Sequence, residues 1–223
     1  MTKEPTQPLW VHYRLTIHAD DLAGGLPVDP RLIDAWQQAH WSKRADVVLQ
    51  PGDPKTPEEA AARTADLLSG VVADEAGWTT FPRDPVTKEL CIEGRQIKAA
   101  LKEAANICKL MPQFAIRGKQ VPLRSKLAER VFVLERLLPM SPSRTEPDDT
   151  IERPIHVMTA QGPRDALKRT DIVRNVVLGC TLRVLNDGLF TKGLLEGLLE
   201  YAGQNGLGAD RSQGMGRFTA GLE

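Results

Sequence analysis

The chain has 223 residues, and its 29 Lys and Arg residues balance its 29 Asp and Glu residues, so the net charge is zero. This balance argues against a basic tail that coats nucleic acid indiscriminately, and any nucleic-acid site must be local. Aromatic residues make up only 5% of the chain, which argues against extensive base stacking on aromatic side chains. A chain of this length suits one core with an insertion.

The three cysteines lack the spacing of a metal site or of a disulfide framework. Cys91, Cys108 and Cys180 are odd in number and form no Cys-x-x-Cys pair, so we interpret them as small buried hydrophobic residues of a reducing cytosol. No apolar run approaches the length of a membrane span, and no signal-peptide core follows the first residues. We expect a cytoplasmic protein that binds no metal, needs no cofactor and has no membrane partner.

The first predicted element is a half-buried strand over residues 9–19. Apolar and polar residues alternate there, with Leu15 and Ile17 on one side and His12 and His18 on the other. This period of two is typical of a strand with one buried face.

The composition changes between about 22 and 80. Two helix starts occur in this stretch, at Asp29 and at Thr56, and each is an N-cap residue followed by proline. They predict helices near 30–41 and 57–68. We therefore interpret 22–80 as a mostly helical insertion.

A turn, a short strand and a helix entry are expected over 81–94, and a helix is expected from Arg95 to Lys109. Ile97 and Leu101 repeat at helical spacing. Four basic residues lie on another face, where solvated surface is the commonest reading: Arg95, Lys98, Lys102 and Lys109.

The rest of the chain alternates between loops and strands before a final helix. A basic, loop-like stretch is expected over 112–130, and excursions are expected over 139–150 and 162–169. Strands are expected from 131, 153 and 176, and a helix from Thr191 to Ala202. The order of elements predicts an α+β fold with helices on one face of an antiparallel sheet, of which a ferredoxin-like, RRM-like sheet is the best specific form. Another two-layer α+β domain is the alternative.

A glycine-rich loop follows this helix. Four glycines bracket four polar residues: Gly206, Gly208, Gly214 and Gly216 around Asp210, Arg211, Ser212 and Gln213. A helix C-cap with a tight turn is one reading, but it does not account for the second pair of glycines. A loop of this kind aims backbone amides at an anion, and Arg211, Arg217 and Ser212 add donors for phosphate. A dinucleotide loop or P-loop is excluded, because a helical pattern precedes this loop.

The loop from Gly206 to Phe218 resembles the C-terminal glycine-rich loop of the RAMP superfamily, the RNA-binding proteins of CRISPR effector complexes and crRNA processing. A second segment, Pro82 to Lys102, resembles the part of type III effector backbone subunits that reads Arg-Asp-Pro, then Ile-Pro-Gly-Ser-Ser, then Leu-Lys-Gly-x-Leu-Arg. In that family the segment grips the guide RNA backbone. By this resemblance, Gly94 is the close-approach glycine, Lys98 is the family lysine and Lys102 stands at the family arginine.

The second segment departs from the family pattern at several positions. Glu93 replaces a proline, Arg95 and Gln96 replace two serines, and Ala99 replaces a glycine. Slicing members carry an aspartate five residues before the arginine, where this chain has Trp78. We therefore expect no metal-dependent cleavage of a target at that position.

The resemblance implies a non-catalytic RNA-binding backbone subunit of a CRISPR-type ribonucleoprotein for antiviral defence. Its implied partners are single-stranded guide RNA, target RNA or DNA, copies of itself and other effector subunits. A hairpin that reaches the next subunit is expected at 139–150 or 160–170. The expected RNA-binding residues are Gly94, Arg95, Lys98, Lys102, Lys168, Arg169, Gly206, Gly208, Arg211, Ser212, Gln213, Gly214, Gly216 and Arg217.

Two other functions stay open. A crRNA-processing endoribonuclease would use a histidine as general acid or base, and His18 at the end of the first strand is the candidate. A phage or mobile-element relative would coat single-stranded RNA or DNA. A small-molecule enzyme is the weakest reading, because no Ser-His-Asp order, metal cluster or cofactor fingerprint occurs.

Overall fold

A computed structural model of the chain describes residues 8–29, 31–32, 56, 59, 62, 77–115, 118–119, 121–159 and 162–223. The chain divides into two compact units. The first unit comprises Met1–Gly24, Phe81–Asp149 and Ile172–Glu223, and the second comprises Gly25–Thr80 and Thr150–Asp171. Both sequence motifs therefore belong to the first unit.

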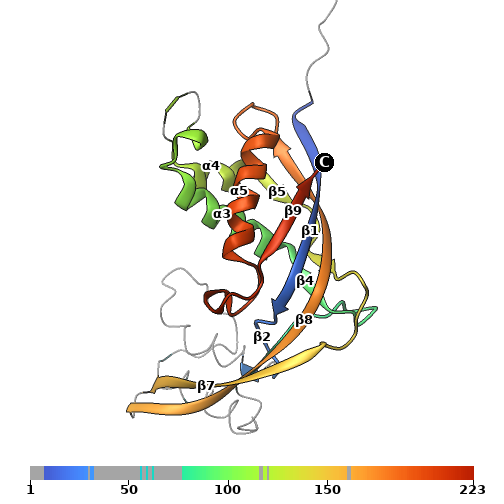
Figure 1. Cartoon of the computed structure of the whole chain (residues 1–223), viewed down its shortest axis with the longest axis vertical. Coiled ribbons are helices and arrows are strands. Elements are labelled where there is room, and N and C mark those ends of the chain that lie inside the picture. Colours follow the sequence, from blue (N-terminus) through green and yellow to red (C-terminus); the bar gives the residue numbers. More distant parts are fainter. Residues whose placement is uncertain are drawn as a thin grey trace, which may run out of the picture. The chain divides into compact units, whose positions relative to one another are not determined.

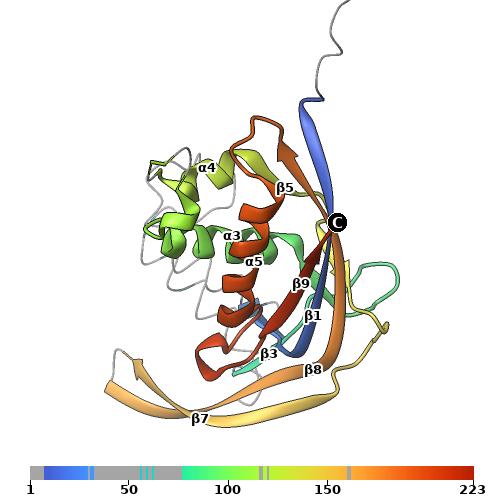
Figure 2. The same cartoon turned by 45° about the horizontal axis from the view of Figure 1, so that its top comes forward.

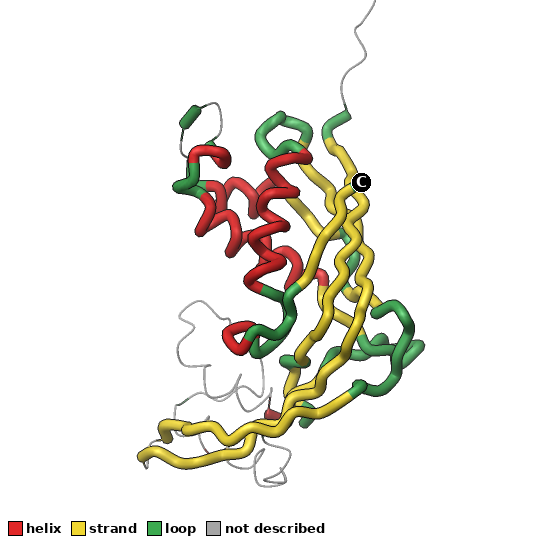
Figure 3. The backbone as a smooth tube through the Cα atoms, viewed as in Figure 1, coloured by secondary structure: helices red, strands yellow, loops and turns green. Residues whose placement is uncertain are grey.

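The first unit is built on an antiparallel sheet with helices on one face (Figures 1 and 3). The elements that form this sheet and its two main helices are, in chain order, β1 (Trp10–Ala23), α3 (Gly94–Cys108), β5 (Val131–Val133), the later part of β8 (Gly162–Leu185), α5 (Lys192–Asn205) and β9 (Phe218–Leu222). The strands are ordered β5-β8-β1-β9, and neighbours are antiparallel. This is the βαββαβ arrangement of ferredoxin-like domains, so the predicted fold class is confirmed.

Strand β1 has the predicted alternation of buried and exposed residues. Leu15 and Ile17 are fully buried under the helices, whereas His12 and His18 are exposed on the other side of the strand. The strand continues beyond the predicted end, because pairing with β8 extends to Ala23 opposite Ile172.

The predicted helix in the second motif is confirmed as α3. It follows the short strand β4 (Cys91–Glu93), which pairs with β6 (Leu137–Pro139). Ile97 and Leu101 are buried on the side that packs against the sheet and the other helices. Helices α3 and α5 lie on the same face of the sheet in Figure 2.

Helix α5 begins and ends with the expected signals. The Thr191 hydroxyl oxygen accepts a hydrogen bond from the Leu194 amide at 3.3 Å, which confirms the predicted N-cap. The amide of Gly206 donates to the Ala202 carbonyl at 2.8 Å and closes the helix.

The prediction of a basic loop over 112–130 is wrong. Residues Pro112–Phe114 form the 3-10 turn η2, and Leu123–Arg130 form helix α4. Its basic composition concealed the two leucines at positions 123 and 127, which are four residues apart and fully buried. Because those side chains pack beneath one face, tertiary contact stabilises a helix of only eight residues.

The stretch at 162–169, expected to be an excursion, belongs to strand β8, and β8 pairs with β7 (Asp149–Thr159). In the second unit, Arg169 and Thr170 of β8 also pair in parallel with β3 (Trp78–Thr80). Strand β3 also pairs with β2 (Leu26–Pro27). The ends of the stretch expected to be a helical insertion are thus strands.

At both predicted helix starts in that stretch, the side chain of the N-cap residue accepts a hydrogen bond from a backbone amide. The Thr56 hydroxyl oxygen accepts from the Glu59 amide at 3.1 Å, and the Asp29 carboxylate accepts from the Arg31 amide at 2.9 Å. Most of the helices expected at 30–41 and 57–68 lies outside the described residues.

The three cysteines are free thiols and are buried, so their prediction as small buried residues is confirmed. Burial raises the pKa of Cys180 to about 12, and the nearby Glu135 carboxylate adds to the rise. The thiol therefore stays protonated at neutral pH. Among the helices that the structure describes, none is both long and apolar enough to cross a membrane.

Candidate nucleic-acid interface

The structure brings the two sequence motifs together within the first unit. The Arg211 guanidinium, in the glycine loop (residues 206–217), forms an ion pair with the Glu103 carboxylate of α3 at 2.7 Å. A cavity of about 140 Å³ lies between them. It is lined by Gln96, Ala99, Ala100 and Glu103 of α3 and by Gly206, Leu207, Gly208 and Arg211 of the loop.

The glycines of this loop allow backbone segments to approach one another closely. At Gly216, φ is +76° and a Cβ would lie 1.8 Å from the Leu207 carbonyl oxygen. At Gly208, φ is +78° and a Cβ would lie 2.6 Å from the Ala23 carbonyl oxygen. The absence of side chains therefore serves the packing of the loop onto itself and onto the end of β1.

Most of the loop amides are bonded inside the protein. The Ala209 amide donates to the Ala23 carbonyl at 2.9 Å, and the Gly216 amide donates to the Asp21 carbonyl at 2.8 Å. The amides of Leu207, Gln213, Gly214 and Met215 also donate to carbonyls within the loop. The expectation of a nest of outward-pointing amides is wrong for these six groups.

The side chains at the tip of the loop face solvent. Ser212 and Gln213 belong to the 3-10 turn η3 (Arg211–Gln213) and are exposed, as is Arg217 after it. Within the described part of the chain, Arg217 takes part in no ion pair. These side chains can therefore reach a ligand without giving up a protein contact.

Glu103 was not anticipated from the sequence, although its position on α3 was. The hydrogen bond from Arg211 lowers the pKa of Glu103, with burial opposing it and Asn205 adding to it. The carboxylate is therefore ionised at neutral pH and offsets the charge of Arg211. Nearby, Gln96 Oε1 is shielded from solvent and has no hydrogen-bond partner in the described part of the chain.

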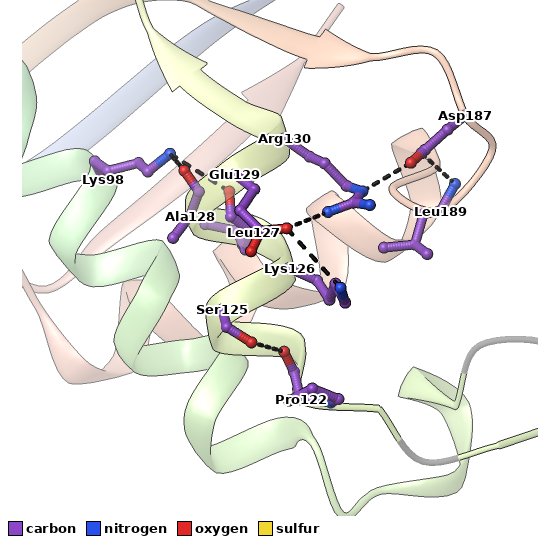
Figure 4. A network of polar contacts seen from close by, with 10 residues as sticks. All are labelled: Lys98, Pro122, Ser125, Lys126, Leu127, Ala128, Glu129, Arg130, Asp187 and Leu189. Atoms are coloured by element: carbon purple, nitrogen blue, oxygen red, sulfur yellow. Dashed lines mark hydrogen bonds and ion pairs between the residues drawn. The ribbon is translucent and has the colours of Figure 1, made fainter.

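Lys98 lies on α3, but its ammonium group serves the end of α4 (Figure 4). The Nζ atom donates to the carbonyls of Ala128 at 3.0 Å and Leu127 at 3.4 Å, and also to the Val131 carbonyl. It lies 4.6 Å from the centre of the Phe132 ring. Burial lowers the pKa of Lys98, and the charge of Lys102 lowers it further. Its role as an RNA contact stays a prediction.

The other expected contacts are distributed over the fold. Gly94 is buried, with a virtual Cβ 2.0 Å from the Glu135 carbonyl oxygen. Arg95 is exposed and pairs with Glu93 at 2.6 Å. Lys102 lines a separate groove between α3 and α4.

Lys168 and Arg169 belong to the second unit. Both lie in β8, and the Arg169 guanidinium pairs with Glu152 of β7 at 2.6 Å. They stay predicted contacts of a hairpin formed by β7 and β8.

Trp78 has a structural partner of its own. Its indole Nε1 donates to Asp171 Oδ1 at 2.8 Å, and the Thr150 hydroxyl donates to the same oxygen at 3.0 Å. No group of three or more His, Cys, Asp and Glu side chains suited to a metal ion occurs among the described residues. The candidate catalytic residue His18 is exposed on β1, opposite Thr219 of β9.

No protein-family model matches the chain, and no curated protein matches it. Among solved structures, the chain is similar to one chain of the cryo-EM structure of the Type III-B Cmr-beta bound to cognate target RNA. The sequence identity is 13% and the TM-score is 0.46. The match covers 96% of this chain and 60% of that chain, so this chain spans less than two thirds of its neighbour's length.

Proposed function

We propose that this chain is a non-catalytic subunit that binds single-stranded RNA between the glycine loop and α3. The observation that carries the proposal is the ion pair between Arg211 and Glu103, because it ties the glycine loop to α3, the helix in which the second family-like segment ends. The two residues are 108 positions apart in sequence. The sequence alone therefore does not predict that the two segments lie side by side; the fold brings them together.

The chemistry of the exposed loop suits a nucleic-acid backbone. Arg217 offers a planar cationic fork, and Ser212 and Gln213 offer neutral donors. Contacts of this kind bind phosphates without reading the base sequence.

The zero net charge suits repeated copies along one strand. Subunits that line up on a guide RNA must pack against each other without mutual repulsion, and a local cationic site on a neutral chain allows this. We propose that the chain oligomerises along a guide RNA in a CRISPR-type ribonucleoprotein, with the β7–β8 hairpin as the element that reaches a neighbour.

Replacing Arg217 with alanine is expected to weaken the binding of single-stranded RNA by about 5-fold, to a similar extent for unrelated sequences. Fluorescence anisotropy at several salt concentrations should also show a shallower salt dependence, by about one phosphate contact. Lys192→Ala is the matched control, because it removes one exposed cation at the opposite end of α5. An equal loss in the control, or a loss for one RNA sequence only, would contradict the proposal.

Replacing Glu103 with glutamine is expected to strengthen RNA binding by about 3-fold, because it frees Arg211 and removes a carboxylate that repels phosphate. The free energy of unfolding should change by less than about 1 kcal/mol, since both partners of the pair are partly exposed. The control is Glu200→Gln, which removes an exposed carboxylate of α5. Weaker RNA binding by the Glu103 variant would show that the pair is needed to shape the site.

A further inference from the structure

A second groove in the first unit lies between α3 and the start of α4. Its volume is about 350 Å³, and we call it the α3–α4 groove. It is lined by Lys102 and Asn106 of α3, by Lys109 directly after the last residue of α3, and by Pro122, Arg124, Ser125 and Ala128. The first three residues are spaced four and three positions apart, so they lie along one side of the helix and its C-terminal end.

The walls of the groove are strongly cationic. Three of the lining residues are Lys102, Lys109 and Arg124, and no carboxylate is among the described residues that line it. The carboxylates of the two helices are engaged elsewhere: Glu129 pairs with Arg130 at 2.8 Å and with Lys126 at 3.9 Å (Figure 4), and Glu103 pairs with the glycine loop. The positive charge of the groove is therefore not neutralised by the helices that form it.

The positive charge of the groove also affects Lys98, which contacts one of the lining residues. Lys98 donates to the carbonyl of Ala128, which is one of the lining residues. Burial lowers the pKa of Lys98, and the positive charge of Lys102 lowers it further. A bound anion beside Lys102 would offset this repulsion.

The donors in the groove suit a phosphate group. Lys109 Nζ donates to Asn106 Oδ1 at 3.1 Å, which occupies the acceptor of the amide and leaves its NH₂ group as a donor. The Ser125 hydroxyl donates to the Pro122 carbonyl at 2.9 Å (Figure 4), so it serves the first turn of α4 instead. An arginine fork and two ammonium groups remain, and this combination binds phosphate oxygens well.

The size of the groove is compatible with a small ligand. Its volume of about 350 Å³ lies at the lower end of the range for small-molecule sites, which extends from about 300 to 1,000 Å³. That space accommodates one nucleotide unit with its phosphate.

We propose that the α3–α4 groove is a nucleotide-phosphate site in which Lys102, Lys109 and Arg124 hold the phosphate. The site is separate from the glycine-loop cavity, although one of its three cations, Lys102, is also an RNA contact implied by the sequence resemblance. Two sources present the same chemistry: a free nucleotide, and one nucleotide of a bound RNA strand.

The first test uses inorganic pyrophosphate as the probe in isothermal titration calorimetry. The wild-type chain should bind it, and Arg124→Ala and the Lys109→Ala/Arg124→Ala double variant should bind at least about 10-fold more weakly. Lys126→Ala is the matched control, because Lys126 lies on α4 and outside the groove lining. The proposal is overturned by a wild-type chain that does not bind at millimolar pyrophosphate, or by a Lys126 variant that loses as much affinity as the Arg124 variant.

Thermal unfolding of each variant checks that a lost affinity is not a lost fold, and the exposed Arg124 single substitution keeps the test valid if the double variant unfolds. AMP and a short single-stranded RNA then identify the source. Weaker AMP binding by Arg124→Ala with unchanged RNA binding assigns a free nucleotide, and weaker RNA binding assigns a strand. Arg217→Ala should leave pyrophosphate binding unchanged. The RNA affinity of the same variant tests the glycine-loop proposal, so either proposal can fail without the other.

Discussion

Replacing Gly216 with alanine is expected to lower the free energy of unfolding by about 3 kcal/mol or more. A Cβ at this position would lie 1.8 Å from the Leu207 carbonyl oxygen and 2.7 Å from the Leu207 nitrogen. These are backbone atoms, and the Leu207 amide donates to the Gly216 carbonyl at 2.8 Å. The loop must therefore open for the methyl group to fit.

Urea unfolding followed by circular dichroism would measure this loss, and RNA binding should fall with it because the loop carries Arg211 and Arg217. Gly214→Ala is the control for the backbone angle alone. Its φ is +86°, but no atom lies within 4 Å of a Cβ there, so we expect a cost of only about 1–2 kcal/mol. Equal losses for the two variants would show that the positive φ, and not the close approach of the two backbone segments, limits position 216.

Replacing Lys98 with methionine is expected to lower the free energy of unfolding by about 2 kcal/mol, the usual scale for hydrogen bonds to a charged group. Methionine keeps the unbranched stem of the side chain and removes the ammonium group. The carbonyls of Leu127, Ala128 and Val131 would then lose their shared donor at the end of α4. Chemical unfolding midpoints at constant slope would report the change.

The control for this prediction is Lys102→Met, one turn further along α3. Lys102 lines the α3–α4 groove, and its charge is the second cause, next to burial, of the lowered pKa of Lys98. Removal of the Lys102 charge should therefore leave the free energy of unfolding unchanged or slightly higher. If Lys98 acts mainly as an RNA contact, its methionine variant will lose affinity for RNA while its unfolding midpoint stays at the wild-type value. That outcome would contradict the structural role.

The elements that could be predicted are those with a local signal. The alternation in β1 indicates its buried face, and Thr191 followed by leucines at helical spacing indicates α5 and its first residue. Helix α4 has a weaker signal, because it is only eight residues long and has two leucines one turn apart, so its stability depends on the burial of those leucines. The first part of β8 is polar, and it forms a strand only because β3 and β7 supply pairing partners.

The candidate site could be located from the sequence, but the roles of its residues could not. A glycine that lets a ligand approach and a glycine that lets another backbone segment approach look the same in the sequence, because both positions require only the absence of a Cβ. At Gly208 the structure shows which case applies, because the neighbouring group is the Ala23 carbonyl. In the same way, the sequence indicates the basic face of α3. It does not indicate the carbonyl partners of Lys98, because they lie about 30 positions further along the chain.

The two hydrogen bonds that tie the glycine loop to Asp21 and Ala23 set an order for folding during synthesis. These residues end a strand near the beginning of the sequence, and the loop amides that bond to them lie almost 200 positions later. Contacts of such long sequence separation form late, because most of the chain must already be ordered before they close. The loop therefore cannot close onto the end of β1 until the chain has been synthesised up to Gly216.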